Sequence, residues 1–520
     1  MRMKIRAFCL VGCALAAGIL SAQTPVPAPA PEAAKKPPPL FANLGDYHRP
    51  ISSRSPDAQR YFDQGLRLVY GFNHEEAFRA FEHAASVDPG CGICSWGMAL
   101  VQGPNINLPA IPERAAAGYA AEQGALERAA SASPVERALI EALSKRYAKS
   151  SPTDPKAQKA LDAAYANAMR RVAARFPSDP DVATLFAESL MDLRPWDLWT
   201  HSGAPQPGTR EILSQLERVL ARHPSHPGAN HYYVHAIEAS PRPDRALASA
   251  RRLESMMPGA GHLVHMPAHI YMRTGRYEEA AAANRRAILS DARYTEEAGP
   301  RDIYQMYVAH NHQFLWAAAM MEGRSAEALE AARNTVAAAP VEMLRAMPGF
   351  DILLTYPVLT LARFGRWEAT LLEPAPPSDF PFAGAMWHYA RGIAFASTDR
   401  LEEAAAENRE LERLAAPIPA DARESLNSAA ALLGIARRVL SARIAARQGR
   451  TEDAIRDLTA AASEEDGLSY AEPADWHSPV RQALGALLLA RGDAGRAERV
   501  YREDLRRNPE NGWALFGLAR

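Results

Sequence analysis

Small and aromatic residues recur along most of this chain in a pattern 34 residues long, separated by polar positions. Apolar residues three or four positions apart are typical of amphipathic helices, and no segment shows the strict alternation of a strand. Counted from Ala58 as place 1, the pattern places Tyr61 at 4, Gly65 at 8, Ala77 at 20, Phe81 at 24, Ala84 at 27 and Pro89 at 32. The spacing predicts two antiparallel helices per repeat.

The same pattern returns near the other end of the chain. Counted from Ser478, it places Gly485, Ala497, Tyr501 and Pro509. Frames that start at Pro227, Gly261, Ala309, Ala385 and Ile435 each place an alanine at place 20: Ala246, Ala280, Ala328, Ala404 and Ala454. Glycines typical of helix ends mark the predicted turns between paired helices: Gly275, Gly323, Gly365, Gly449 and Gly492.

These residues resemble the tetratricopeptide repeat superfamily over most of 53–520, although 104–156 and 343–384 match poorly. The resemblance implies an all-α fold, a right-handed superhelical solenoid whose first helices line a concave groove. Such grooves bind a protein, a peptide or a small ligand. We divide the array into N-terminal repeats (53–200), a histidine-rich segment (201–342) and C-terminal repeats (343–520). Trp513, Leu515 and Leu518 indicate one further first helix that caps the last repeat.

The N-terminal segment predicts export. Basic residues in 1–6, an apolar run over 7–20 and small residues at 21 and 22 are typical of a signal peptide, residues 1–22. We therefore expect a periplasmic or secreted protein. The alternative, lipidation at Cys13, has only about six apolar residues before the cysteine, short of a usual signal. A proline-rich tether follows over 23–52, and no later run reaches the ~18 apolar residues of a membrane-spanning helix.

The amino-acid composition limits the classes of partner and of enzyme that the sequence supports. Hydrophobic residues make up 48% and charged residues 23%, which are values of a folded globular chain. Lys plus Arg number 59 and Asp plus Glu 60, so no excess of basic charge indicates nucleic acid. Phosphate-binding, dinucleotide-binding and nucleophile-elbow motifs are absent from the sequence.

Histidine is concentrated in one part of the repeat array. Ten of the 15 histidines lie between His201 and His312. His231 and His235 are four residues apart, as are His265 and His269, so each pair shares one helix face. His231 and His265 both occupy place 5 of their frames, and His235 and His269 both occupy place 9. The pairs are therefore predicted to stack on neighbouring repeats.

By the tetratricopeptide resemblance, places 2, 5, 9 and 12 face the groove, which adds His262 and Glu238 to the same surface. Side chains from two packed helices can close on one ion at ~2.0–2.1 Å. We therefore predict a transition-metal site of His231, His235, His265 and His269. His262, His310 and His312 are further candidate ligands. Structural packing of these histidines is the alternative.

Imidazole ligation without sulfur suits Zn, Cu, Ni or Fe. If the site is catalytic, in an oxidoreductase or a hydrolase, Glu238 is the candidate proton acceptor. Pro267 removes a helical hydrogen bond inside the second pair, so this helix either kinks or starts near His265. The segments HYYVH and GHLVHMPAHIY also resemble a group of exported bacterial tetratricopeptide proteins, which lends no activity.

Two other segments remain open. Cys91 and Cys94 form a CxxC that is a disulfide, a metal half-site or a redox pair. The stretch 192–199, with Trp196 and Trp199, is a lid over the groove or a wedge between helices. The sequence as a whole predicts an exported repeat scaffold that binds a ligand in its groove, with a histidine metal site there. A metal-dependent enzyme is the alternative.

Overall fold

The computed structural model describes residues 37–150, 152, 154–299 and 304–520. The predicted signal peptide, Cys13 and the start of the predicted tether lie outside the described residues. The described chain from Pro38 onward forms one compact unit. Within the described residues, no helix combines the length and the apolar character needed to cross a membrane.

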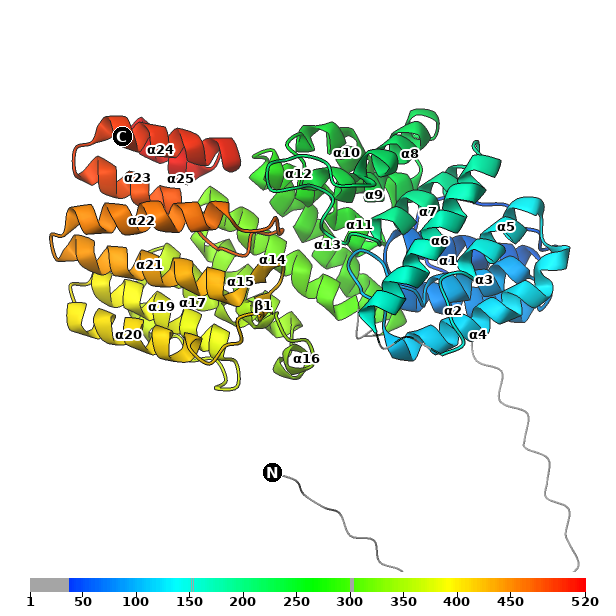
Figure 1. The fold of residues 1–520 in the computed structure, drawn as a ribbon, viewed down its shortest axis with the longest axis horizontal. Helices are drawn as coiled ribbons and strands as arrows, with labels where there is room; N and C mark the ends of the chain where they lie inside the picture. The colour runs from blue at the N-terminus through cyan, green and yellow to red at the C-terminus, as the bar shows by residue number, and fades with distance from the viewer. Residues whose placement is uncertain (1–36, 151, 153, 300–303) are drawn as a thin grey trace, which may run out of the picture. The chain divides into compact units, whose positions relative to one another are not determined.

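The described chain is an all-α array of helix pairs, as predicted (Figure 1). The N-terminal part contains α1 (Pro56–Tyr70), α2 (His74–Val87), α3 (Gly92–Leu100), α4 (Pro112–Arg128), η1 (Ala129–Ser131), α5 (Pro134–Leu143), α6 (Pro155–Arg175) and α7 (Pro180–Met191). The histidine-rich part contains α8 (Thr209–Arg222), α9 (Pro227–Glu238), η2 (Pro243–Ala246), α10 (Leu247–Met256), α11 (Gly261–His265), α12 (Pro267–Arg273), α13 (Tyr277–Ala298), α14 (Tyr304–Glu322) and α15 (Ser325–Ala338).

The C-terminal part continues the array. It contains α16 (Val341–Ala346), η3 (Asp351–Thr355), α17 (Tyr356–Arg363), α18 (Trp367–Leu372), α19 (Pro381–Ser397), α20 (Leu401–Ala415), α21 (Ala429–Arg447), α22 (Thr451–Asp466), α23 (Val480–Ala490), α24 (Ala494–Arg507) and α25 (Gly512–Ala519). The strands β1 (Arg423–Glu424) and β2 (Asn427–Ser428) pair antiparallel in a short hairpin, with Arg423 opposite Ser428.

Glycines at place 8, and at place 6 of the following unit, let neighbouring helices pack onto the aromatic residue of place 24. A Cβ added to Gly65 would lie 2.6 Å from the ring of Phe81, and one added to Gly97 would lie 2.5 Å from it. Gly485 and Gly517 approach the ring of Tyr501 in the same way, at 2.5 Å and 2.2 Å. The repeat pattern therefore reflects close approach of helices, which a larger residue would prevent.

The turns between paired helices have a common conformation. The five predicted glycines all have positive φ, between 67° and 87°. The residue after each glycine donates its N–H to a carbonyl five positions earlier, as Arg276 does to Tyr271 at 2.8 Å. This is the hydrogen bond of a Schellman helix end, which favours glycine. Phe72 occupies the same position after α1 with φ 55°, and Asn73 donates to Leu68.

Pro267 divides the predicted helix in two. α11 ends at His265 and α12 begins at Pro267, where proline takes the first helical position and its missing N–H costs little. The break does not separate the second histidine pair, because the ring centroids of His265 and His269 lie 4.8 Å apart.

Both ends of the described chain pack onto the array. Residues 38–52, which belong to the predicted tether, contain the buried residues Phe41, Leu44 and Arg49. Hydrogen bonds and apolar burial hold this stretch on the helices, so the tether does not extend to residue 52. At the C-terminus, Trp513 of α25 donates its indole N–H to the carbonyl of Met320 on α14 at 2.8 Å.

Candidate metal centre

Six histidines form two groups of three in the middle of the array. The first histidine trio is His231, His235 and His262, and the second histidine trio is His265, His269 and His310. In each trio, one ligand atom per residue lies within 4.8 Å of the others. The four ligands predicted for a single site are therefore divided between two groups, His231 and His235 with His262, and His265 and His269 with His310.

Four neighbouring helices supply these side chains. His231 and His235 lie one turn apart on α9, and His262 and His265 lie on α11. His269 lies on α12 and His310 on α14. Figure 1 shows these helices in green, in the middle of the sequence. The trios therefore arise from successive repeats and not from one local motif.

Acceptor oxygens fix the orientation of two rings in the first trio. His231 donates Nδ1–H to the carbonyl of Tyr70 at 2.7 Å, and His235 donates Nδ1–H to Glu238 Oε1 at 2.7 Å. A carbonyl and a carboxylate can only accept hydrogen bonds, so the ring proton lies on Nδ1. In the neutral ring, Nε2 then carries no proton and is available as a ligand atom. Nε2 of His231 lies 3.1 Å from Nε2 of His262.

The second trio is held in the same way on all three rings. His265 donates Nδ1–H to Asn284 Oδ1 at 2.7 Å, and His269 to Glu238 Oε2 at 2.5 Å. His310 donates to Gln313 Oε1 at 2.9 Å. The amide nitrogens of Asn284 and Gln313 donate elsewhere, which directs their oxygens at the histidines. Nε2 of His265 lies 2.9 Å from Nε2 of His269.

Two imidazole nitrogens in the first trio are buried and lack a hydrogen-bond partner among the described residues: Nε2 of His235 and Nδ1 of His262. A buried polar atom without a partner costs about 1–3 kcal/mol. In a cluster of potential ligands, such atoms are available to bind an ion or a water molecule.

The protonation states of three of these rings favour ligation. Burial, followed by the neighbouring histidines, lowers the pKa values of His262 and His265 well below the usual range. Burial and the same histidines lower the pKa of His310 to about 4. Burial also opposes protonation of His269, but the charges and hydrogen bonds of Glu238 and Glu472 together outweigh it and raise the pKa of His269 to about 9. At neutral pH, His262, His265 and His310 are therefore neutral, as metal ligands must be, whereas His269 must release a proton to bind an ion.

Two carboxylates lie beside the second trio. Glu238 bonds to both His235 and His269, so one side chain connects the two trios. Glu472, in the loop between α22 and α23, lies 3.4 Å from His269 Nδ1, and the hydroxyl of Tyr470 bonds to it. Glu238, His269 and Glu472 form a third group with metal-ligand geometry. With both oxygens engaged by imidazoles, Glu238 is placed to orient the rings.

Aromatic side chains cover the trios, which corrects the expectation of an open groove. The Phe72 ring lies 4.5 Å from His231, and the Phe314 ring lies 4.6 Å from both His265 and His269. His231 and His265 are 0% exposed. The histidines at places 5 and 9, and His262 at place 2, are buried in the array. A groove ligand reaches these rings only if the cover moves.

The tryptophan-rich stretch contributes to this cover. The Trp196 ring lies 5.5 Å from His235, edge to face. Trp199 donates its indole N–H to the carbonyl of Ala236 on α9 at 2.8 Å and is half-buried. Trp196 thus covers the first trio, while Trp199 packs against the helix that carries it.

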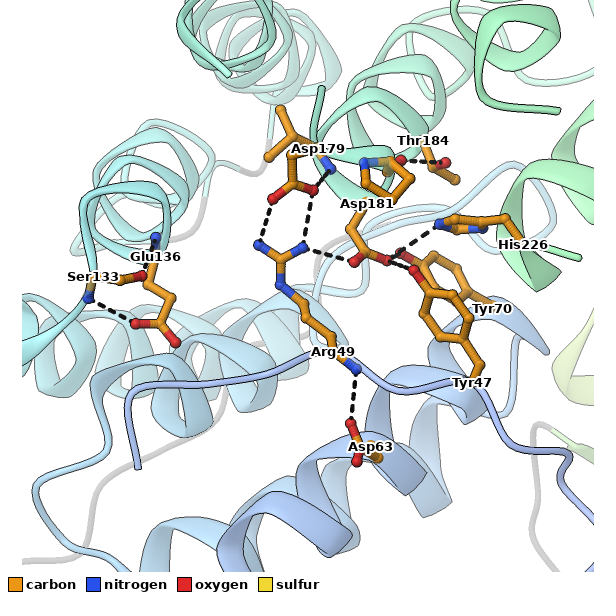
Figure 2. A network of polar contacts seen from close by, with 12 residues as sticks. Tyr47, Arg49, Asp63, Tyr70, Ser133, Glu136, Asp179, Asp181, Thr184 and His226 are labelled. Atoms are coloured by element: carbon orange, nitrogen blue, oxygen red, sulfur yellow. Dashed lines mark hydrogen bonds and ion pairs between the residues drawn. The ribbon is translucent and has the colours of Figure 1, made fainter. Parts of the chain in front are cut away.

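A buried polar network fixes the start of α9 (Figure 2). Asp181 accepts hydrogen bonds from Tyr47 at 2.7 Å, Tyr70 at 2.5 Å and Arg49 at 2.7 Å. His226, the N-cap of α9, lies 3.2 Å from the same carboxylate. Since Tyr70 also holds His231 through its carbonyl, the network positions both the helix and the acceptor of the first trio.

A small surface pocket adjoins the first trio. Phe72, Tyr307, Tyr304, Asn105 and Arg114 are among its lining residues. The rings of Phe72 and Tyr307 lie 5.5 Å and 4.6 Å from His262. The pocket and the trio are thus separated by single aromatic side chains.

Other predicted residues lie outside the trios. His312 is partly buried on α14, and burial lowers its pKa, but the structure places it in neither trio. Cys91 and Cys94 form a disulfide at the start of α3, one of the three alternatives for the CxxC.

Several residues of the centre were missed from the sequence. Asn284 occupies place 24, where Phe81 and Tyr501 stand in the complete repeats. A polar residue at a place that is otherwise aromatic and buried could have been recognised in the sequence as a partner of the histidines. Glu472, Tyr470 and Phe72 gave no such signal, because each reaches the trios from a loop or turn distant in sequence.

The sequence matches no protein-family model and no curated protein. Among solved structures, yeast Tom70 is 11% identical, covers 89% of this chain and 95% of its own, and has a TM-score of 0.34. The Cut9–Hcn1 assembly of the APC/C is 12% identical over 89% of this chain and 76% of that chain, with a TM-score of 0.29. IFIT1 with Gppp-AAAA is 11% identical, covers 79% of this chain and 89% of its own, and has a TM-score of 0.35. At these scores, no function carries over, and the repeat fold follows from the helix pairs and turns described above.

Proposed function

We propose that this chain is a helical-repeat protein that binds a transition-metal ion through the buried histidines. The observation that carries the proposal is the orientation of the rings. Five of the six imidazoles donate Nδ1–H to a protein oxygen. This is the arrangement in which metal-bound histidines are usually held, with the other ring nitrogen directed at the ion.

A second candidate function is metal-dependent catalysis as an oxidoreductase or hydrolase. Three imidazoles leave a tetrahedral ion one open position, as in catalytic zinc sites. Zn, Cu, Ni and Fe all accept such ligands. In either function we assign Glu238 a positioning role instead of that of proton acceptor, because imidazoles already occupy both of its oxygens.

Elemental analysis of the chain, purified without chelators, tests the proposal. We expect at least one transition-metal ion per chain. The double variant His231→Gln/His265→Gln should lose it, since each trio loses a ligand. The matched control is His223→Gln/His312→Gln, which removes two histidines outside the trios and should retain the metal. Metal-free wild type that also fails to bind added Zn²⁺ or Cu²⁺ would overturn the proposal.

We also propose that the protein is exported to the periplasm or secreted. The Cys91–Cys94 disulfide supports this proposal, because disulfides persist mainly in oxidising compartments. Mass spectrometry of the protein recovered from envelope and medium fractions should give an N-terminus near residue 23. A full-length, cytoplasmic protein, or one that is lipid-modified at Cys13, would contradict cleavage after residue 22.

Binding of a protein or peptide partner by the array stays a prediction. A pull-down from envelope extract with the metal-loaded chain should recover a specific partner if the array acts as an interaction scaffold.

A further inference from the structure

We infer that the repeat builds two separate metal sites, one in each histidine trio, so that the chain binds a pair of neighbouring ions. This inference rests on the proposed function, which requires only one ion. It is carried by the equivalence of the two trios in sequence register, ring geometry and surroundings.

The register produces the same ligand set twice. His231 and His235 occupy places 5 and 9 of one frame, and His262 occupies place 2 of the next. His265 and His269 occupy places 5 and 9 of that next frame, and His310 occupies place 2 of the frame after it. Each trio therefore consists of two histidines from one repeat and one from its successor.

The ring geometry agrees closely between the trios. In the first, the centroid distances are 4.8 Å for His231–His235, 4.9 Å for His231–His262 and 6.1 Å for His235–His262. In the second, the corresponding distances are 4.8, 4.9 and 5.9 Å for the pairs His265–His269, His265–His310 and His269–His310. Three rings bound to one tetrahedral ion at ~2.0–2.1 Å have centroids about 5 Å apart. Each trio thus has the size of a complete three-imidazole site.

The surroundings repeat as well. One phenylalanine lies against each trio, Phe72 on the first and Phe314 on the second. Glu238 accepts a hydrogen bond from one histidine of each. The trios are adjacent, because the centroids of His235 and His269 lie 5.5 Å apart. With ligand lengths of ~2 Å, ions in the two trios are separated by at most about 12 Å.

Copper(II) titration with electron paramagnetic resonance tests the inference, because two copper(II) ions this close broaden or cancel each other's signal. We expect the wild-type chain to bind two ions per chain with a broadened or diminished signal. His231→Gln and His265→Gln should each retain one ion with a sharp signal of full intensity. His312→Gln, a matched control on α14, should behave as the wild type.

The outcomes separate the two proposals. No bound copper in the wild type overturns the proposed function itself. A single ion, two ions with undisturbed signals, or loss of both ions from either single variant overturns the inference alone. Circular dichroism establishes that each variant is folded, and His262→Gln and His310→Gln provide a second pair if the first pair does not fold.

Discussion

Phe72 has a positive φ, a backbone conformation that glycine or aspartate adopts at the equivalent turns of other repeats. Five equivalent turns contain glycine and another contains Asp399, all with positive φ. A bulky residue there costs about 1–2 kcal/mol. The Phe72 ring contacts His231 and His262, so the strain is located at the candidate centre, where such outliers are commonly retained for function.

A pair of substitutions isolates this strain. Phe72→Ala and Phe72→Gly remove the same ring, but only glycine relaxes the turn. We expect both variants to be less stable than the wild type, and Phe72→Gly to be more stable than Phe72→Ala by about 1 kcal/mol in urea unfolding. If Phe72→Ala were the more stable variant, as alanine is relative to glycine inside an ordinary helix, the turn would be unstrained.

Glu238 accepts hydrogen bonds from histidines of both trios. Glu238→Gln keeps the shape but offers only one oxygen to two imidazole donors. We expect the metal affinity to fall by roughly 10–100-fold, as for other partners of ligating histidines, with the helix content unchanged. Isothermal titration with Zn²⁺ measures this change. Glu254→Gln, which removes a carboxylate bonded to Tyr271, is the control and should bind as the wild type.

At the scale of the helix pair, the glycine–aromatic contact determines how closely repeats pack. Gly65 and Gly97 lie on opposite helices against one ring, that of Phe81. The place-8 glycine is thus a packing requirement in the repeats that retain it.

Two alanine substitutions test this requirement. Alanine generally stabilises a helix interior relative to glycine by up to about 1 kcal/mol. Gly434→Ala on α21 should show this gain, since its Cβ would meet only Glu464 at an ordinary 3.7 Å. Gly65→Ala should instead destabilise, because overpacking against Phe81 costs about 1–3 kcal/mol. Equal effects in denaturant unfolding would contradict the packing role.

The sequence predicts helix pairs, their turns and the alignment of four histidines, because all of these follow from a local period. The i and i+4 spacing and the shared places of His231 and His265 sufficed to bring the rings together. Burial of the histidines was not predictable in this way. Tyr470 and Glu472 reach the second trio from a loop some 200 positions later, and that approach depends on the packing of all the repeats in between. No single repeat encodes it.

At the scale of the whole described chain, the Asp181 network joins the N-terminal stretch to α1, α7 and α9 (Figure 2). Burial opposes ionisation of Asp181, but His226 and the charge of Arg49 outweigh it and hold the pKa of Asp181 well below its usual range. A depressed carboxylate pKa stabilises the fold above the pKa of the unfolded chain, ~3.9, and this stabilisation is lost as the pH falls below it.

Asp181→Asn should therefore lower the stability at pH 7 by about 3–5 kcal/mol, because it leaves buried Arg49 with only Asp179 as a charged partner. The free energy of unfolding of Asp181→Asn should also fall less than that of the wild type as the pH is lowered below about 4. Urea unfolding at a series of pH values measures both effects. Asp244→Asn, at a fully exposed ion pair, is the control and should follow the wild type. Parallel pH profiles for Asp181→Asn and the wild type would contradict the role given to this carboxylate.

The position of the six histidines within the repeat has a consequence for how such a centre arises. A trio that spans the boundary between two repeats is completed by the place-2 residue of the following unit. An in-frame duplication of one 34-residue unit carrying histidine at places 2, 5 and 9 therefore copies a whole ligand set, without any new point mutation. Deletion of one such unit removes one complete ligand set. In a protein of this construction, the number of metal ions would evolve by the gain and loss of gene segments.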